Sequence, residues 1–202
     1  MEFSPLLIGL LIAAGIAVVL VLWVISSYNG LIVSRQKYQN GFAQIDVQLK
    51  RRHDLIPNLL ECVKGYMSHE RETLEAVIRA RNTALTANQS ASRDPGNPQA
   101  MKDLGQAEGQ LSGALSRLLM VAEAYPDLKA NQNMMQFQGE LTETENRISL
   151  ARQTFNNQIT GYNTQREMFP TVVVAGMLGF QAASLLEIGV AEREAPKVSF
   201  GK

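Results

Sequence analysis

The sequence predicts an all-α fold, in which one N-terminal transmembrane helix is followed by an elongated antiparallel four-helix bundle with a short C-terminal apolar helix. Three observations support this fold class: an uncharged apolar run near the N-terminus, apolar residues recurring at helical spacing through most of the remaining chain, and only 7 prolines in 202 residues. The predicted parts are a transmembrane anchor at 1–27, a helical bundle at 28–190 and a tail at 191–202.

The anchor is predicted from the run between Pro5 and Ile25, PLLIGLLIAAGIAVVLVLWVI, which contains no charged residue. A helix of this length spans about 30 Å, the thickness of the hydrocarbon core of a bilayer. A cleaved signal peptide is the alternative. It is disfavoured because the residues before the run include Glu2 and no basic side chain, and because the run exceeds the usual apolar region of a signal peptide.

Basic residues flank the anchor on one side only. No Lys or Arg precedes the run, whereas Arg35 and Lys37 follow it closely. The positive-inside rule therefore predicts a single-pass protein of the cell (inner) membrane, with its N-terminus outside and its bundle in the cytoplasm.

Small residues form a stripe along the predicted anchor, because Gly9, Ala13 and Ala17 recur every four positions and share one helix face. Such a face lets a second transmembrane helix approach closely, which favours a homo-oligomer. The alternative is that Gly and Ala are simply common in membrane helices, and the sequence leaves both interpretations open.

A coiled-coil-like repeat predicts the first helix of the bundle. Its residues follow one another at steps of four and three, and the only charged one is Arg52. Pro57 lies inside the repeat without changing its phase, so we expect a kinked but continuous helix. Gly65 and Ser68 are expected to end this helix and to cap the next. The repeat consists of Tyr38, Phe42, Ile45, Leu49, Arg52, Ile56, Leu59, Val63 and Tyr66.

Two further helices are predicted on either side of a loop rich in turn-forming residues. The ranges are 74–85 for the second helix, 86–99 for the loop and 101–121 for the third helix. Gly105, Gly109 and Gly113 share one face of the third helix. Each costs up to about 1 kcal/mol relative to Ala, so three in register predict the close approach of another backbone.

The fourth helix has the most regular repeat in the chain. Tyr125–Pro126 is expected to separate it from the third helix, and Phe169–Pro170 to end it. Its apolar residues recur at every seventh position, at Met134, Leu141, Ile148, Phe155, Tyr162 and Phe169.

Four antiparallel helices return the chain to the membrane at the apolar segment 171–190. One interpretation is that this segment packs on the anchor or lies in the membrane interface, and the other is that it forms a short helix capping the bundle core. A second full span is disfavoured by Glu187 and the internal glycines. The candidate membrane contacts are Val172, Val173, Val174, Met177, Leu178, Phe180, Leu185 and Leu186.

The sequence offers no chemistry typical of an enzyme. The 19 basic residues balance the 19 acidic ones, which disfavours a nucleic-acid partner. His53 and Cys62 would lie on opposite helix faces, and about 10 Å would separate Cys62 from His69, so they form no tetrahedral metal site. HExxH, GxSxG and Walker motifs are absent from the sequence. We therefore expect no catalytic residue, no metal and no cofactor.

A basic run at Lys50, Arg51 and Arg52 is the candidate partner surface. Its simplest interpretation is a solvated face with Asp46 and Asp54 nearby. Arg52 differs because it falls within the apolar repeat. It either pairs with an acidic residue on another helix or marks an opening of the repeat toward an outside partner.

Two long stretches resemble the LemA family. The first begins at Tyr28 and reads YNGLIVSRQKYQNGFAQIDVQLKRRHDLIPNLLECVKGYMSHERETLEAVIRARN, and the second begins at Ala124 and reads AYPDLKANQNMMQFQGELTETENRISLARQTFNNQITGYNTQREMFP. The resemblance implies a prokaryotic, single-pass membrane protein with a cytoplasmic helical bundle and no catalytic residue. It also implies relatives associated with membrane-organelle formation in magnetosome-forming bacteria. Where the family often has a Tyr-Phe pair, this chain has Leu185-Leu186, which favours membrane contact by that segment.

These observations predict a membrane-anchored, non-enzymatic helical scaffold that self-associates and presents a cytoplasmic interaction surface. The candidate partners are membrane lipids, further copies of the chain and another membrane protein. The alternative function is an adaptor or regulator of a membrane enzyme, such as a protease or signalling kinase, that binds through the basic run.

Overall fold

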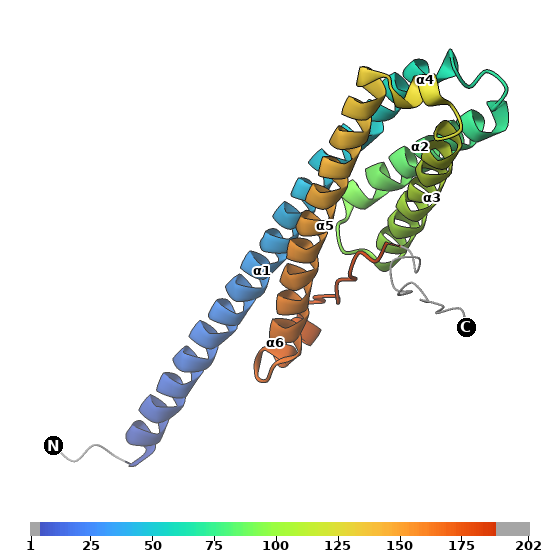
Figure 1. Cartoon of the computed structure of the whole chain (residues 1–202). Helices are drawn as coiled ribbons and strands as arrows, with labels where there is room; N and C mark the ends of the chain where they lie inside the picture. Colours follow the sequence, from blue (N-terminus) through green and yellow to red (C-terminus); the bar gives the residue numbers. More distant parts are fainter. Residues whose placement is uncertain (1–4, 189–202) are drawn as a thin grey trace, which may run out of the picture.

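The computed structural model describes residues 5–188, with side chains from Ile8 onward. These residues contain six helices and no strand, which confirms the predicted all-α fold (Figure 1). The predicted tail at 191–202 lies outside the described residues. The helices are α1 (Pro5–Lys64), α2 (Arg71–Arg93), α3 (Pro98–Ala122), α4 (Pro126–Lys129), α5 (Gln132–Glu167) and α6 (Thr171–Met177).

The anchor and the first bundle helix form one uninterrupted helix. α1 contains 60 residues, which corresponds to about 90 Å at 1.5 Å per residue. Its N-terminal part extends beyond the rest of the molecule, with exposed side chains from Ile8 to Leu22 (Figure 1). Within the described part of the chain, α1 is the one helix long and apolar enough to cross a membrane. A continuous helix therefore connects the membrane anchor to the bundle.

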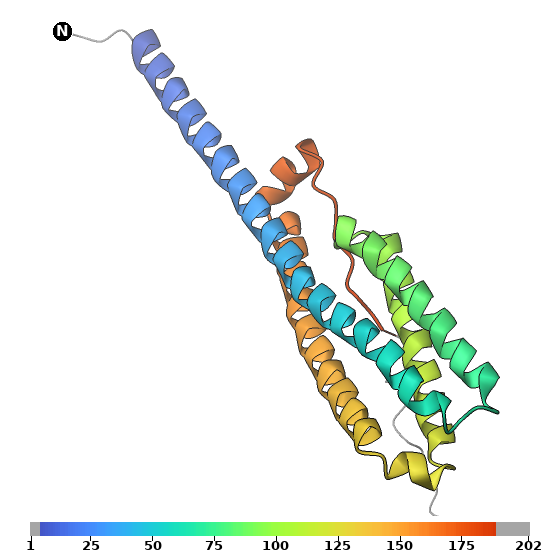
Figure 2. The ribbon, with the colours of Figure 1, turned by 90° about the horizontal axis from the view of Figure 1, so that it is seen from above.

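The C-terminal part of α1 packs antiparallel against α5, and α2 and α3 form a hairpin beside them (Figures 1 and 2). The predicted repeat of α1 is buried from Tyr38 to Val63, as its spacing requires. Tyr66 is the exception. It is exposed because α1 ends at Lys64, and the side chain of Met67 is buried in its place.

Pro57 lies inside α1 without ending it, which confirms the predicted continuity. A proline has no N–H, so the carbonyl of His53 loses the hydrogen bond that residue 57 would otherwise donate. Arg81 of α2 replaces it, because its Nε donates to the His53 oxygen at 2.7 Å. The partly buried carbonyl thereby keeps a partner, and α2 is attached to α1 at the proline.

The predicted loop at 86–99 is mostly helical, because α2 continues to Arg93 and the connection to α3 is short. Burial of Asn88 and Ala91 against α1 outweighs the turn propensity of this stretch. Asp46 of α1 also holds it, since its Oδ1 accepts hydrogen bonds from Asn88 Nδ2 at 2.7 Å and Ser92 Oγ at 3.2 Å.

The helix starts differ from the predicted caps at one position. α2 begins after Glu70, whose side chain makes no capping hydrogen bond, so the prediction of Ser68 as the N-cap was wrong. The other two long bundle helices have ordinary asparagine caps. Asn97 accepts from the first amides of α3, and Asn131 from those of α5.

α5 confirms the seven-residue repeat over most of its length, with Met134, Ile148, Phe155 and Tyr162 fully buried. Phe169 departs from the repeat and is 83% exposed. The reason is that α5 ends at Glu167, so Phe169 is no longer placed by the helix.

The segment after α5 is helical only in α6. Gly179 has a φ of +71°, and α6 ends in a Schellman motif in which Phe180 N donates to Ala175 O at 3.0 Å. The chain then runs without helical structure through residues 180–188, where Phe180, Ala183 and Leu186 are buried in the bundle. The predicted capping of the core is thus shared between a short helix and an extended segment.

The apolar interior consists of two clusters along the bundle. The membrane-side cluster runs from Leu31 to Leu49 on α1 and includes Leu186 of the extended segment. The distal cluster begins at Ile56 and includes Leu111 of α3. Arg52 and His53 lie between the two clusters, so a polar layer separates them.

Candidate interaction groove between α3 and α5

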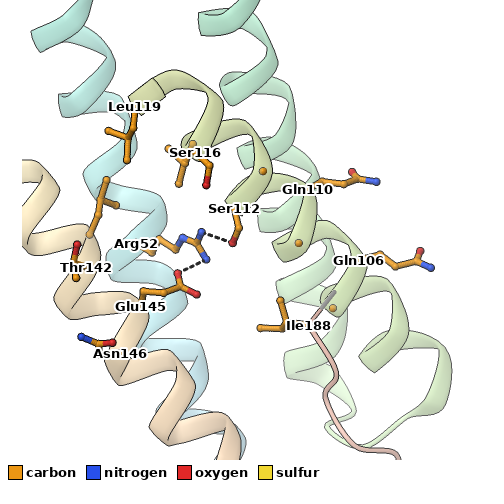
Figure 3. Close-up of a pocket in the computed structure, with 15 residues that line it drawn as sticks. Arg52, Gln106, Gln110, Ser112, Ser116, Leu119, Thr142, Glu145, Asn146 and Ile188 are labelled. Carbon is orange, nitrogen blue, oxygen red and sulfur yellow. Dashed lines mark hydrogen bonds and ion pairs between the residues drawn. The ribbon is translucent and has the colours of Figure 1, made fainter. Parts of the chain in front are cut away.

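The polar layer centres on a buried carboxylate that the sequence analysis missed. Glu108 of α3 is 0% exposed, and its Oε2 lies 3.3 Å from Arg52 Nη1. The same Nη1 lies 3.1 Å from Glu145 of α5, and Nη2 donates to Ser112 Oγ at 2.8 Å (Figure 3). Arg52 therefore joins α1, α3 and α5.

His53 completes the layer on its inner side. Its Nε2 lies 2.8 Å from Glu108 Oε1, and both side chains are fully buried. This contact links the imidazole ring to the same carboxylate that binds Arg52. The other ring nitrogen, Nδ1, has no hydrogen-bond partner in the structure.

A sequence signal for Glu108 existed in the spacing of α3. Met101, Leu104 and Leu111 are buried, and position 108 fills the gap between Leu104 and Leu111 at the same alternation of four and three. A glutamate at that position, together with Arg52 in the repeat of α1, was the detectable sign of a buried pair.

A groove of about 1000 Å³ opens between α3 and α5 above this layer. Arg52 and Glu145 line it at the ion pair, and Gln106 and Gln110 of α3 lie at its rim (Figure 3). Asn146 and Thr142 line the α5 side, and Leu115, Leu119 and Leu141 supply an apolar surface. The groove therefore offers apolar surface beside polar side chains.

The groove is the distal part of a longer valley between α3 and α5. The membrane-side part of this valley is filled by the extended segment 180–188. Asn163 of α5 donates to Ala183 O at 2.8 Å and accepts from Ala183 N at 3.0 Å. One heptad earlier, Asn156 donates to Leu186 O at 3.1 Å and accepts from Leu186 N at 2.9 Å. Each asparagine thus satisfies both backbone groups of one residue, as a neighbouring strand would.

Two further hydrogen bonds hold the extended segment. Tyr162 donates its hydroxyl proton to Gln181 O at 2.8 Å, and Ser184 N donates to Gly96 O at 2.8 Å in the α2–α3 connection. Because these partners come from both walls of the valley, the segment is held from two sides.

The glycine face of α3 lines the valley. A Cβ on Gly105 would collide with the carbonyl of Glu187, which confirms the predicted approach of another backbone at this position. A Cβ on Gly113 would meet no atom of another element within 4 Å among the described residues. The face is therefore occupied at Gly105 and open at Gly113.

The candidate partner surface at 50–52 is divided by the structure. Arg52 is 3% exposed and its charge is used inside the bundle, so its assignment to an outside partner is corrected. Lys50 and Arg51 are exposed, and Lys50 Nζ lies 2.6 Å from Asp46. Burial raises the pKa of the Asp46 carboxyl, but hydrogen bonds from Lys50, Asn88 and Ser92 outweigh it and leave that pKa below its usual value.

The candidate membrane contacts are also divided. Val174, Phe180 and Leu186 are buried in the bundle, so they cannot face lipid and are corrected. Leu185 is exposed but lies along the side of the bundle, between the residues that Gly96 and Asn156 hold. Contact of the remaining candidates with lipid stays a prediction, and these are Val172, Val173, Met177 and Leu178.

Two further predictions concern the small-residue stripe of the anchor and the absence of a metal site. Gly9, Ala13 and Ala17 are exposed on α1, and their role in helix packing stays a prediction. Among the described residues, no group of three or more His, Cys, Asp or Glu side chains has an arrangement that could hold a metal ion.

The chain is similar in sequence to known proteins. The LemA family matches residues 41–200. Protein LemA of Metamycoplasma hominis is 26% identical over 165 residues, covering 82% of this chain and 71% of its own. Magnetosome protein MamQ 2 of Paramagnetospirillum magneticum is 23% identical over 175 residues, covering 79% of this chain and 64% of its own. The match over residues 41–200, together with the apolar N-terminal helix, shows that the chain belongs to the LemA family and is a membrane-associated helical protein.

Proposed function

We propose that this protein is a membrane-anchored, non-enzymatic scaffold that self-associates through α1 and presents the α3–α5 groove to other membrane proteins. The groove is the observation that carries the proposal. It is open in the described residues, and it continues a valley in which an extended backbone is already seated. Relatives named as magnetosome proteins are consistent with a role at membranes.

The chemistry of the groove suits an extended segment of a partner. Gly113 leaves room for a backbone to approach α3, as Gly105 does for residues 187 and 188. Asn146 of α5 supplies an amide that can donate to and accept from backbone groups, and the Thr142 hydroxyl oxygen, whose proton is donated to Gln138 O, can accept. Recognition of backbone by side-chain amides, with apolar side chains on Leu119 and Leu141, would repeat the arrangement seen on the membrane side.

The position of the groove restricts which partner can reach it. Arg52 lies about 40 Å along α1 from Ile25, at 1.5 Å per residue. If the N-terminus is outside, as the positive-inside rule predicts, and α1 continues away from the bilayer, the groove would lie in the cytoplasm beyond the lipid headgroups. The partner is therefore the cytoplasmic part of a neighbouring membrane protein, held near the same bilayer.

Self-association is supported by the exposed stripe of Gly9, Ala13 and Ala17 on the part of α1 that no other described element covers. The test is the mass of the complete protein in lipid nanodiscs or mild detergent. We expect a defined oligomer, which the double substitution Gly9→Ile/Ala13→Ile reduces to monomer. Substitution of Leu11→Ile, on another face of the same helix, is the matched control. A wild-type monomer at all concentrations would refute self-association.

The adaptor function is the second candidate, and the exposure of Lys50 and Arg51 supports it. Under this alternative, Lys50→Glu/Arg51→Glu leaves the bundle folded but removes one specific partner in crosslinked pull-downs. Gly113→Trp would fill the groove and serves as the companion variant, because nothing lies within 4 Å of that position. Loss of the partner with Gly113→Trp alone favours the scaffold, and loss with the charge reversal alone favours the adaptor.

A further inference from the structure

The end of the bundle beside the anchor carries a continuous apolar surface. No charged residue occurs between Met168 and Phe180. Phe169 is 83% exposed and Met177 is 80% exposed, so these two side chains point away from the bundle. The other exposed large apolar residues of the stretch are Met168, Val172, Val173 and Leu178.

Other exposed large apolar residues of the bundle, which include Val33, Tyr66, Met135 and Leu185, are spread over several elements. Val47 on α1, Ile78 on α2, Met120 on α3 and Leu150 on α5 belong to four different helices. Single exposed apolar residues are normal on soluble surfaces, whereas a contiguous apolar patch marks an interaction site. The surface formed by Met168–Leu178 is therefore the one that calls for a covering partner.

Contacts with α1 fix the level of this surface relative to the membrane. The ring centroid of Phe180 lies 5.7 Å from that of Tyr28, and Arg35 Cζ lies 4.7 Å from the Phe180 ring. Tyr28 follows Ile25, the end of the apolar run, by about 5 Å along the helix axis. Figure 1 shows α6 beside α1 at the point where the bundle begins. α6 therefore lies at the height where headgroups and acyl chains meet.

The two faces of α6 differ in a way that suits an interfacial position. Val174 and Ala175 are buried against the bundle core, which holds the helix in place. Val172, Val173 and Met177 are exposed on the other side of the helix. Because α6 contacts α1, whose exposed apolar run is predicted to cross the membrane, the bilayer itself is the occupant best matched to the patch.

We propose that Met168–Leu178 inserts shallowly into the leaflet from which α1 emerges and forms a second point of membrane contact. One helix crossing a bilayer leaves the attached bundle free to tilt and rotate. A second contact, offset from α1, fixes the bundle relative to the membrane plane and sets the direction in which the α3–α5 groove opens. This inference concerns the wild-type chain in its membrane and does not depend on the groove having a partner.

The test uses the complete protein in lipid nanodiscs, with Cys62→Ser to remove the native thiol. An environment-sensitive fluorophore is attached at Met177→Cys, at Val173→Cys or at Met120→Cys. Met120 is 71% exposed on α3 and serves as a matched apolar position far from α6. Nitroxide-labelled lipids report contact with the bilayer, and iodide reports contact with water.

We expect blue-shifted emission at positions 173 and 177, strong quenching by lipids labelled near the headgroup, and protection from iodide. The fluorophore at position 120 should show the reverse. Equal iodide quenching at all three positions would overturn the proposal. Protection from iodide without lipid quenching would also overturn it, because the surface would then be covered by protein, such as a second copy of the chain. Two independent positions on α6 guard against one label disturbing the local fold.

Discussion

The membrane-side and distal halves of the bundle use the same helices differently. On the membrane side, the valley between α3 and α5 is filled by residues 180–188, and two asparagines hold the backbone of that segment. On the distal side, the same valley is open and lined by Gly113 and Asn146. The layer of Arg52 and Glu108 stands at the boundary. Among the described residues, the same helix pair is therefore covered by an extended backbone on the membrane side and uncovered on the distal side.

The largest effect is expected at the boundary layer. Glu108→Ala should lower the free energy of unfolding by about 3–5 kcal/mol, because it leaves the charge of Arg52 buried with the half-exposed Glu145 as its remaining charged partner. The measurement is urea denaturation of the complete protein in detergent micelles, followed by far-UV circular dichroism. Glu123→Ala, an exposed glutamate near the end of the same helix, is the control. A loss below about 1 kcal/mol would mean that the layer does not join the two halves.

The asparagine pair should matter on the membrane side only. Asn156→Ala or Asn163→Ala removes both hydrogen bonds to one backbone unit, and each should cost about 1–3 kcal/mol. Asn157→Ala, at an exposed neighbouring position, should change the stability by less than about 0.5 kcal/mol. Hydrogen exchange provides a second measurement, in which the amides of Ala183 and Leu186 lose protection in the corresponding variant. Unchanged protection would show that the asparagines do not hold the segment.

Alanine substitutions at Gly113 and Gly105 should change the free energy of unfolding in opposite directions. Gly113→Ala should raise the free energy of unfolding by up to about 1 kcal/mol, because alanine favours the helix and meets no atom there. Gly105→Ala gains the same helix propensity, but its methyl group displaces the Glu187 carbonyl at a cost of about 1–3 kcal/mol. Thermal unfolding of the two variants side by side measures the difference. Equal stabilisation by both would show that the valley is not filled at Gly105.

The smallest effect concerns the pH dependence of the membrane-side half. The pKa of Asp46 is lowered in the folded protein, so its contribution is present above the unfolded-state pKa and is lost as pH falls through the folded-state pKa. Asp46→Asn should therefore remove less than about 1 kcal/mol at neutral pH and nothing once wild-type Asp46 is protonated. Urea denaturation of both proteins between pH 7 and about pH 3 measures this. Parallel curves across the range would contradict it.

The helices and their buried faces were predictable because they depend on local spacing. The repeats of α1 and α5 gave their length and inner faces, and the phase across Pro57 predicted a continuous helix. Helix α2 extends beyond its predicted end because Asn88 and Ser92 gain partners on α1, which local propensity does not report. Tertiary contacts decided this boundary.

The filled half of the valley was less predictable than the helices. An uncharged apolar stretch is compatible with a helix, an interfacial segment or an extended chain. Gly179 was a readable signal for the end of α6. The extended path beyond it depends on Asn156 and Asn163, whose partners lie 30 and 20 residues further along the chain. The glycines of α3 predicted a backbone contact but not which segment would make it.

Thiol labelling of two single-cysteine variants tests the filled and open halves most directly. In the complete protein with Cys62→Ser, Leu186→Cys replaces a side chain that is 1% exposed, and Gly113→Cys adds one where no atom lies within 4 Å. In nanodiscs, a water-soluble maleimide should label position 113 rapidly and position 186 only as fast as the extended segment opens. Equal rates, or faster labelling at 186, would contradict a valley that is filled beside the membrane and open beyond the ionic layer.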